Sequence, residues 1–146
     1  MIDRLAVCAA VIPDDVELGF HLCYGDFKHK HFMEPTDLGV CTEISNRLAA
    51  AAPRTIDYIH LPVPIERDDD AFFAPLDGLA LQPGTHVYVG LIHLDDGVEG
   101  AKRRLDGASG HLTGFGVATE CGFGRRPAET IEPLLALHAD VAALLR

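Results

Sequence analysis

The chain has 146 residues, of which 48% are hydrophobic, and its formal net charge at pH 7 is −10. This length and composition predict a single globular domain over residues 1–146, and the acidic charge argues against nucleic acid or an anionic membrane as a partner. No hydrophobic run approaches the roughly 18–20 residues of a membrane helix, and the N-terminus lacks a signal-peptide pattern, so we expect a cytoplasmic protein.

Segments with strand and helix patterns alternate along the chain. Short apolar runs predict four strands, at residues 16–23, 56–60, 86–91 and 114–119. Apolar residues at helical spacing predict helices at residues 2–12, 38–52, 70–77, 97–107 and from Pro127 onward. This alternation predicts an α/β fold with a parallel sheet. Four strand–helix units fit half of a TIM (β/α)8 barrel or, alternatively, an open doubly wound sheet.

His21 and Cys23 lie two residues apart at the end of the first predicted strand. Because successive side chains on a strand alternate between its faces, these two point the same way. An imidazole nitrogen and a thiolate sulfur on one face suit a shared zinc ion. Ordinary packing within a strand also explains the pair, and two ligands alone do not make a site.

Polar residues that can carry chemistry follow all four predicted strands. These residues are His21 and Cys23, His60, His93, and Glu120 with Cys121. Active sites of parallel α/β folds form at the carboxyl ends of the strands. Together, His21, Cys23 and Cys121 would give zinc three protein ligands and one open position, which is the catalytic arrangement.

Zinc held by two sulfur ligands is suited to binding a substrate thiol, because a coordinating thiol loses its proton at neutral pH. The resulting thiolate is the reactive nucleophile, so the expected chemistry is alkyl transfer to sulfur. His93 could protonate the leaving group, since the pKa of a histidine can lie near the working pH.

Three sequence elements carry a resemblance to a known family. They are His21-Leu22-Cys23-Tyr24, Val87-Tyr88 leading to His93, and Glu120-Cys121-Gly122 followed by Arg125-Arg126. In the order and approximate spacing of these elements, most of residues 16–146 resembles the C-terminal catalytic domain of cobalamin-independent methionine synthase, in the superfamily shared with uroporphyrinogen decarboxylase. The resemblance implies strands five to eight of a TIM-like barrel.

By this resemblance, His21, Cys23 and Cys121 are zinc ligands, and His93 matches the acid that protonates the leaving folate nitrogen. The family's fourth ligand is a glutamate at the end of the next strand, a place that His60 takes here. The resemblance therefore implies a Zn2+-dependent methyltransferase that activates a homocysteine-like thiol for S-methylation, as in methionine biosynthesis. Its partners would be a small-molecule thiol and a methyl donor.

Three further residues are candidates for contact with substrate: Asp26, Glu120 and Arg125. Arg125, with Arg126, could bind an anionic group, although a solvated pair beside a helix start has the same sequence. Asp26 could orient site residues from behind, and an ordinary loop role fits it as well.

Two alternative functions remain open on the sequence. One is a metal-free lyase or decarboxylase of the same superfamily, in which arginine would hold carboxylates and the cysteines would be incidental. The other is an inactive, truncated binding domain. A half-barrel also leaves two edge strands with unpaired backbone groups. We therefore expect self-association or a partner chain that completes the barrel.

Overall fold

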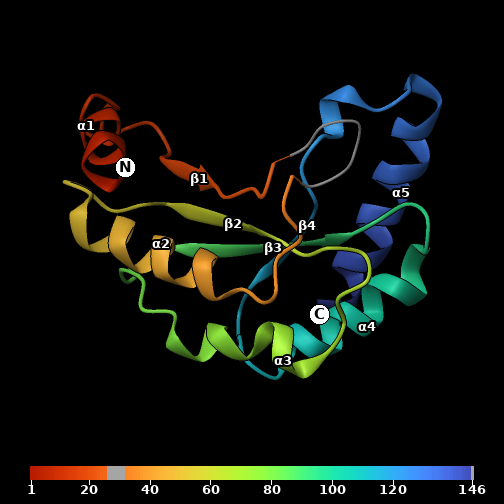
Figure 1. Ribbon diagram of the computed structural model, residues 1–146. Coiled ribbons are helices and arrows are strands. Elements are labelled where there is room, and N and C mark those ends of the chain that lie inside the picture. Colours follow the sequence, from red (N-terminus) through yellow and green to blue (C-terminus); the bar gives the residue numbers. More distant parts are fainter. Residues whose placement is uncertain (26–31, 146) are drawn as a thin grey trace.

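The computed structural model describes residues 1–25 and 32–145 and confirms the α/β fold with a parallel sheet (Figure 1). The sheet has four strands: β1 (Gly19–His21), β2 (Tyr58–Pro62), β3 (His86–Ile92) and β4 (Gly116–Thr119). The α-helices between and around them are α1 (Ile2–Ala10), α2 (Gly39–Ala51), α3 (Asp70–Phe73), α4 (Gly97–Ser109) and α5 (Ile131–Ala142). None of the helices in the described ranges is long and apolar enough to cross a bilayer.

The strands lie in the order β1-β2-β3-β4, so each pairs with the strand that follows it in the chain. A doubly wound sheet contains a point at which this order reverses, and the described sheet has none. Because crossovers between parallel strands are right-handed, an unreversed order carries the connecting helices to one face of the sheet. The topology is that of four consecutive strand–helix units, as in half of a barrel.

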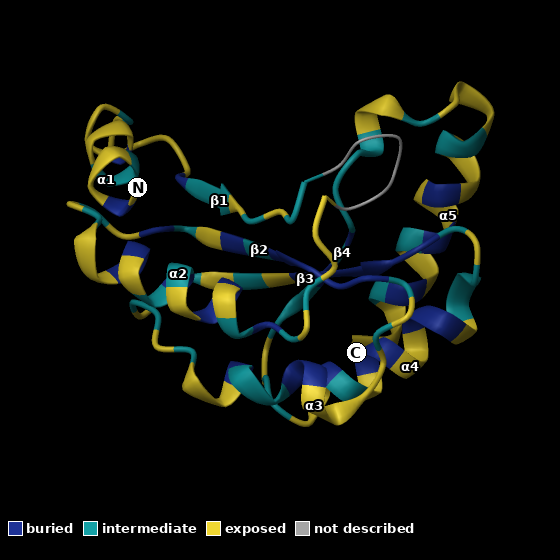
Figure 2. Ribbon diagram, viewed as in Figure 1, coloured by how far each residue is buried: buried dark blue, intermediate teal, exposed yellow. Residues whose placement is uncertain are grey.

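The two faces of the sheet differ in burial (Figure 2). Ile59, Leu61 and Val89 face the helices and are fully buried. On the opposite face, Tyr58 and Tyr88 are 38% and 40% exposed, and their rings meet edge to face with centroids 5.9 Å apart. Parallel sheets are normally covered on both faces, so an open face is a departure that needs an explanation.

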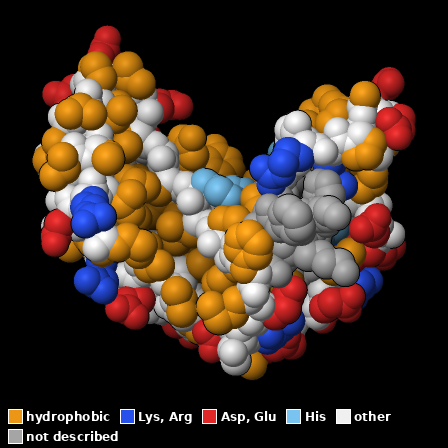
Figure 3. Space-filling view, turned by 45° about the horizontal axis from the view of Figure 1, so that its top comes forward, with side chains coloured by type: hydrophobic (Ala, Val, Ile, Leu, Met, Phe, Trp, Pro, Cys, Tyr) orange, Lys and Arg blue, Asp and Glu red, His pale blue; other side chains and the backbone are white. Residues whose placement is uncertain are grey.

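A hollow lies between two raised ends of the molecule, and histidine side chains lie on its floor (Figure 3). In Figure 1 the two raised ends are α1 and the segment that leads into α5, with β1 between them. The open side of the fold is therefore concave, and within residues 1–25 and 32–145 it carries histidine and tyrosine side chains rather than a second layer of helices.

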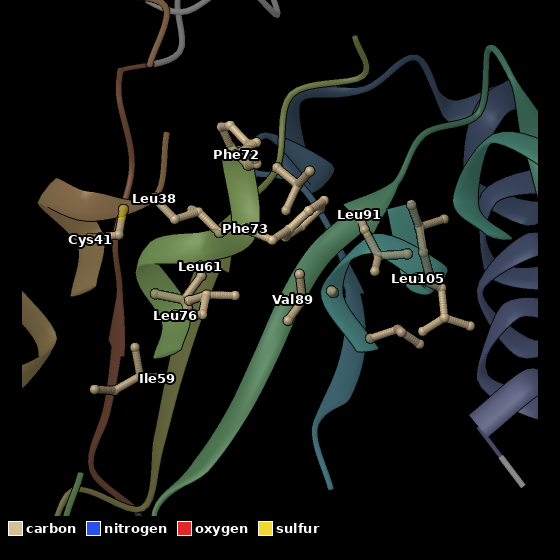
Figure 4. Packing of buried hydrophobic residues seen from close by; sticks show 14 of the residues in the cluster. Leu38, Cys41, Ile59, Leu61, Phe72, Phe73, Leu76, Val89, Leu91 and Leu105 are labelled. Carbon is tan, nitrogen blue, oxygen red and sulfur yellow. The ribbon is translucent and has the colours of Figure 1, made fainter. Parts of the chain in front are cut away.

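The hydrophobic core fills the space between the covered face of the sheet and the helices (Figure 4). Phe72 and Phe73 from α3 pack edge to face, with ring centroids 5.3 Å apart, and both are fully buried. Asp69 caps this short helix by accepting a hydrogen bond from the Phe72 amide. Fully burying a phenylalanine or leucine side chain contributes roughly 1.5–3 kcal/mol, so this layer holds the strands in place.

Arg104 on α4 is an unexpected member of the interior, since it is fully buried. The Arg104 network consists of this side chain and its four hydrogen-bonding acceptors. Its guanidinium donates to both carboxylate oxygens of Asp96, at 2.7 and 2.8 Å, and to the carbonyls of Leu91 and Ile65. The network fastens the start of α4 to the carboxyl end of β3.

Two predicted boundaries differ from the structure. The first strand is short, because β1 pairs with β2 only over Gly19–His21. The last helix does not begin at Pro127: a 3-10 turn, Ala128–Thr130, precedes α5. Helical periodicity predicts that the apolar face of this helix consists of Ile131, Leu134, Leu135, His138, Val141 and Leu145. In the structure the face is rotated, since Leu137 is buried and Leu135 is 56% exposed.

Candidate metal centre

His21, Cys23 and Cys121 form the ligand group, in which one potential ligand atom from each residue lies within 4.8 Å of the other two. His21 ends β1, Cys23 follows two residues later, and Cys121 lies two residues beyond β4. Strand alternation explains why the first two point to one side. The group is the arrangement expected from the sequence, now assembled from segments 98 residues apart.

Curvature of the sheet brings these residues together. The strands β1 and β4 are the two outer strands of the sheet, and three spacings of about 4.8 Å would hold them about 14 Å apart if it were flat. The sulfur atoms of Cys23 and Cys121 are nevertheless 3.2 Å apart. The segments after both strands therefore turn inward over the concave side, as strand ends do in a barrel.

The sulfur–sulfur distance shows whether this cysteine pair forms a disulfide or could bind a metal. At 3.2 Å the atoms are well beyond the roughly 2.05 Å of a disulfide, and neither cysteine forms one. Two thiolates on one tetrahedral zinc, with Zn–S bonds of about 2.3 Å, stand about 3.8 Å apart. A shift of about half an ångström would accommodate the ion, so the donor set fits zinc.

His60 lies beside His21 without belonging to the ligand group. The two rings stack with centroids 4.8 Å apart, and their Nδ1 atoms are 2.8 Å apart. This contact follows from the register, because His21 and His60 are paired positions on neighbouring strands. The predicted role of His60 as a fourth ligand stays a prediction.

His21 is exposed and His60 is half-buried, and contact with the surrounding protein disfavours the charged form of each ring. This partial desolvation lowers the pKa of His21. Burial and the neighbouring His21 lower the pKa of His60 to about 4, against a smaller opposing effect of the Thr119 carbonyl. At neutral pH both imidazoles are uncharged, which is the form that binds a metal.

A pocket of about 670 Å³ opens beside the ligand group. Besides the ligand group and His60, its lining includes two predicted substrate residues, Glu120 and Arg125. This volume is within the range of small-molecule sites. The third predicted substrate residue, Asp26, lies outside the described residues.

Helix α5 also contributes to this pocket, which the sequence pattern did not predict. His138 and Leu135 come from that helix, and Phe123 comes from the 3-10 turn Phe123–Arg125 that precedes it. The periodicity placed His138 on the apolar stripe of the helix, which was the available signal that this histidine faces inward.

His93 occupies a different position at the carboxyl end of β3. It is buried, is absent from the pocket lining, and its Nε2 donates to the Val63 carbonyl at 2.8 Å. Burial lowers the pKa of His93 to about 4, with the Val63 carbonyl opposing and the positive charge of Arg104 assisting. At neutral pH this imidazole is uncharged, and the proton on its Nε2 is held by the carbonyl.

Comparison of the sequence with protein-family models and with curated proteins found no match.

Proposed function

We propose that the chain binds one zinc ion through His21, Cys23 and Cys121 and activates a small-molecule thiol for S-methylation. The observation that carries the proposal is the convergence of these three ligand atoms to within 4.8 Å beside an open pocket. Three protein ligands with a remaining coordination position characterise catalytic zinc, whereas structural zinc has four.

The ligands determine which substrate group suits the metal. Two thiolates and a neutral imidazole cancel the charge of Zn2+, so the bound ion is a weaker acid toward water than one held by histidines alone. When bound, zinc would supply the charge that keeps a substrate thiol deprotonated at neutral pH. Methyl transfer then forms a carbon–sulfur bond with the thiolate electron pair, while the bond from methyl to the donor breaks and its electrons leave with the donor.

Pocket residues would orient the rest of the substrate. Glu120 and Arg125 offer opposite charges on the same lining, which suits a substrate that carries both an amino and a carboxylate group. A homocysteine-like amino acid has these groups and a thiol. We assign Asp26 no contact, because it lies outside the described residues.

The predicted acid His93 receives no step in this proposal. A general acid needs a proton to give, and a neutral imidazole whose Nε2–H is bonded to the Val63 carbonyl has none available. Water in contact with the departing donor would supply its proton.

Cobalt substitution provides a direct test. The Co2+ form should show a thiolate-to-cobalt charge-transfer band from Cys23 and Cys121, and homocysteine should increase it by adding a third sulfur. Homoserine, which has a hydroxyl in place of the thiol, is the matched control and should leave the band unchanged. Equal responses to both compounds would contradict thiol activation. With a methyl donor present, S-methylated product should form only in the metal-loaded protein, and equal product formation by metal-free protein would contradict the role of zinc.

The need for a partner remains a separate proposal. In the described sheet, β1 and β4 each have one edge without a neighbouring strand, and parallel edges of this kind pair readily. We propose that a second copy or another chain pairs with these edges. The mass of the purified protein in solution tests the first option: a mass above that of one 15.8 kDa chain supports self-association, and a monomeric mass contradicts self-association.

A further inference from the structure

A strut of hydrogen-bonding groups runs from the ligand group across the concave face of the sheet. It begins at His21 on β1 and continues to His60 on β2, whose Nε2 lies near the Thr119 carbonyl of β4 without a hydrogen bond to it. Thr119 lies two residues before Cys121, so the strut joins the segments that supply the ligands from both outer strands.

The proton positions in this strut are constrained by its geometry. The Nδ1 atoms of His21 and His60 are 2.8 Å apart, so one of them carries the shared hydrogen and the other accepts it. The Nε2 atom of His60 is buried and forms no hydrogen bond within the described part of the chain. A Cβ atom built on Gly90 would lie 2.6 Å from this nitrogen and 3.0 Å from the Thr119 oxygen, so the Thr119 carbonyl is near it, and a carbonyl can only accept.

These constraints select one arrangement. If Nε2 of His60 carries its hydrogen, that hydrogen faces the Thr119 carbonyl and the bare Nδ1 accepts from His21. The opposite tautomer would direct the Nε2 lone pair of His60 at a carbonyl oxygen, which is repulsive. His21 then holds its hydrogen on Nδ1, and its Nε2 lone pair remains for the metal.

Gly90 on β3 makes the strut possible. A Cβ atom at this position would lie 2.6 Å from Nε2 of His60 and 3.0 Å from the Thr119 oxygen, closer than such atoms normally approach. The absence of a side chain allows the imidazole on β2 to reach over β3 toward β4. The other glycines of the sheet leave room for tyrosine rings instead, so this clearance is specific to His60.

We infer that His60 is a positioning residue for the zinc site: it fixes the ring and tautomer of His21 and does not bind the metal. This inference rests on the proposed zinc site and deepens it. In a histidine that binds a metal, the N–H of the second ring nitrogen commonly donates a hydrogen bond to a fixed acceptor. Removal of that acceptor weakens metal affinity by about 10- to 100-fold. Here the acceptor is a second imidazole, which lies near the backbone of the strand that leads to another ligand.

Zinc affinity, measured by competition with a chromophoric chelator, tests the inference with three variants. His60→Phe keeps the ring volume and removes both nitrogens, so it should bind one zinc per chain with about 10- to 100-fold weaker affinity. His60→Asn returns an oxygen near the Nδ1 position and should recover most of the loss. Gly90→Ala should weaken binding while His60 is still present, and Gly78→Ala, whose new Cβ would meet nothing closer than 4.0 Å, is its control.

The cobalt spectrum and nitrogen NMR separate positioning from ligation. In His60→Phe the cobalt bands should keep the pattern of two sulfurs and one nitrogen, and in the zinc form of the wild type the ring hydrogens should lie on Nδ1 of His21 and Nε2 of His60. Loss of a nitrogen ligand in His60→Phe, or the opposite tautomers, would overturn the inference by making His60 a ligand. Unchanged affinity in both His60→Phe and Gly90→Ala would overturn it by showing no role. If the wild type takes up no zinc, the proposed function itself fails and this inference with it.

Discussion

Histidine occurs in two contrasting settings at the carboxyl ends of the strands. Beside the hollow, His21 has a neighbour on one ring nitrogen and a pair of cysteines within 4.8 Å. At the end of β3, His93 is buried, donates to a backbone carbonyl and lies beside the Arg104 network, in which every guanidinium nitrogen has an acceptor. Both sets lie at the edge where α/β proteins place their sites, but only the first leaves donor atoms directed at an open pocket.

The difference teaches how to distinguish reactive polar residues from structural ones in such folds. Position at a strand end is shared by both settings and does not decide between them. What decides is whether the donor atoms of a cluster are enclosed by their acceptors or face an open pocket. The guanidinium of Arg104 has an acceptor for each nitrogen inside the protein, whereas the ligand group brings two sulfur atoms and an imidazole nitrogen to within 4.8 Å of one another beside a pocket.

Loss of a ligand should have the largest effect on metal binding and a small effect on folding. Cys121→Ser replaces a soft sulfur with an oxygen, and zinc per chain should fall from about one to near zero. The far-ultraviolet circular dichroism spectrum should stay unchanged, because this residue lies outside the core. Cys8→Ser, which alters an exposed cysteine, is the control and should retain the metal. Stoichiometric zinc in Cys121→Ser would show that the ligand group is wrongly assigned.

Disruption of the Arg104 network should have the opposite effects, a large loss of folding stability and little change in metal binding. Arg104→Met removes a fully buried charge and leaves Asp96 with only its longer ion pair to Arg103 at 3.6 Å, so the free energy of unfolding should fall by roughly 3–5 kcal/mol. Urea denaturation of the metal-free protein measures this loss. Arg103→Met, at a side chain that is 57% exposed, should change stability by less than about 1 kcal/mol. Similar losses in both variants would mean that the buried network has no special structural role.

His93 should make stability depend on pH in a defined range. Its pKa of about 4 lies below the ordinary value of about 6.5, so the unfolded chain binds more protons between these pH values. The stability associated with neutral His93 is complete above pH 6.5 and is lost as the pH falls toward 4. His93→Gln can keep the hydrogen bond to the Val63 carbonyl but cannot titrate. In metal-free protein, urea denaturation at pH 7 and pH 4.5 should show a loss about 3 kcal/mol smaller in this variant, and an equal loss would contradict the assignment.

His111 should also make stability depend on pH, with a smaller effect than His93 and in the opposite direction. His111 lies between Asp77 at 2.9 Å and Asp70 at 3.2 Å, and the hydrogen bond to Asp77, followed by that to Asp70, raises its pKa. Its contribution is present below pH 6.5 and is lost as the pH rises through the raised value. Because both carboxylates are exposed, the effect should be below about 1 kcal/mol. His111→Gln and Asp77→Asn should both flatten the stability profile on the alkaline side of pH 6.5, and a flattening in neither would contradict the pairing.

The sequence predicted the fold because its signals are local. Strand and helix periodicity, with turns between them, were enough to predict the parallel α/β sheet, and the His-x-Cys spacing was enough to place His21 and Cys23 on one side. The proximity of Cys121 followed only from the assumption that strand ends converge. The structure supports that assumption through the curvature that brings the sulfur atoms of Cys23 and Cys121 to 3.2 Å.

Long-range burial was beyond the reach of the sequence. Arg104 appeared with Lys102 and Arg103 as part of a basic stretch, and no local pattern distinguishes the buried member from its exposed neighbours. The contact between His21 and His60 depends on strand register, and the clearance above it depends on Gly90, which lies on a third strand. Each of these features needs residues from separate elements to be placed together.

X-ray absorption spectroscopy of the purified protein, with its zinc content measured on the same sample, tests the central claim most directly. The account predicts about one zinc per chain, with two sulfur neighbours at about 2.3 Å and the remaining nitrogen or oxygen neighbours at about 2.0–2.1 Å. Protein that carries no zinc after purification without chelators and does not take it up when it is supplied, or zinc with one or four sulfur neighbours, would contradict the metal centre proposed for His21, Cys23 and Cys121.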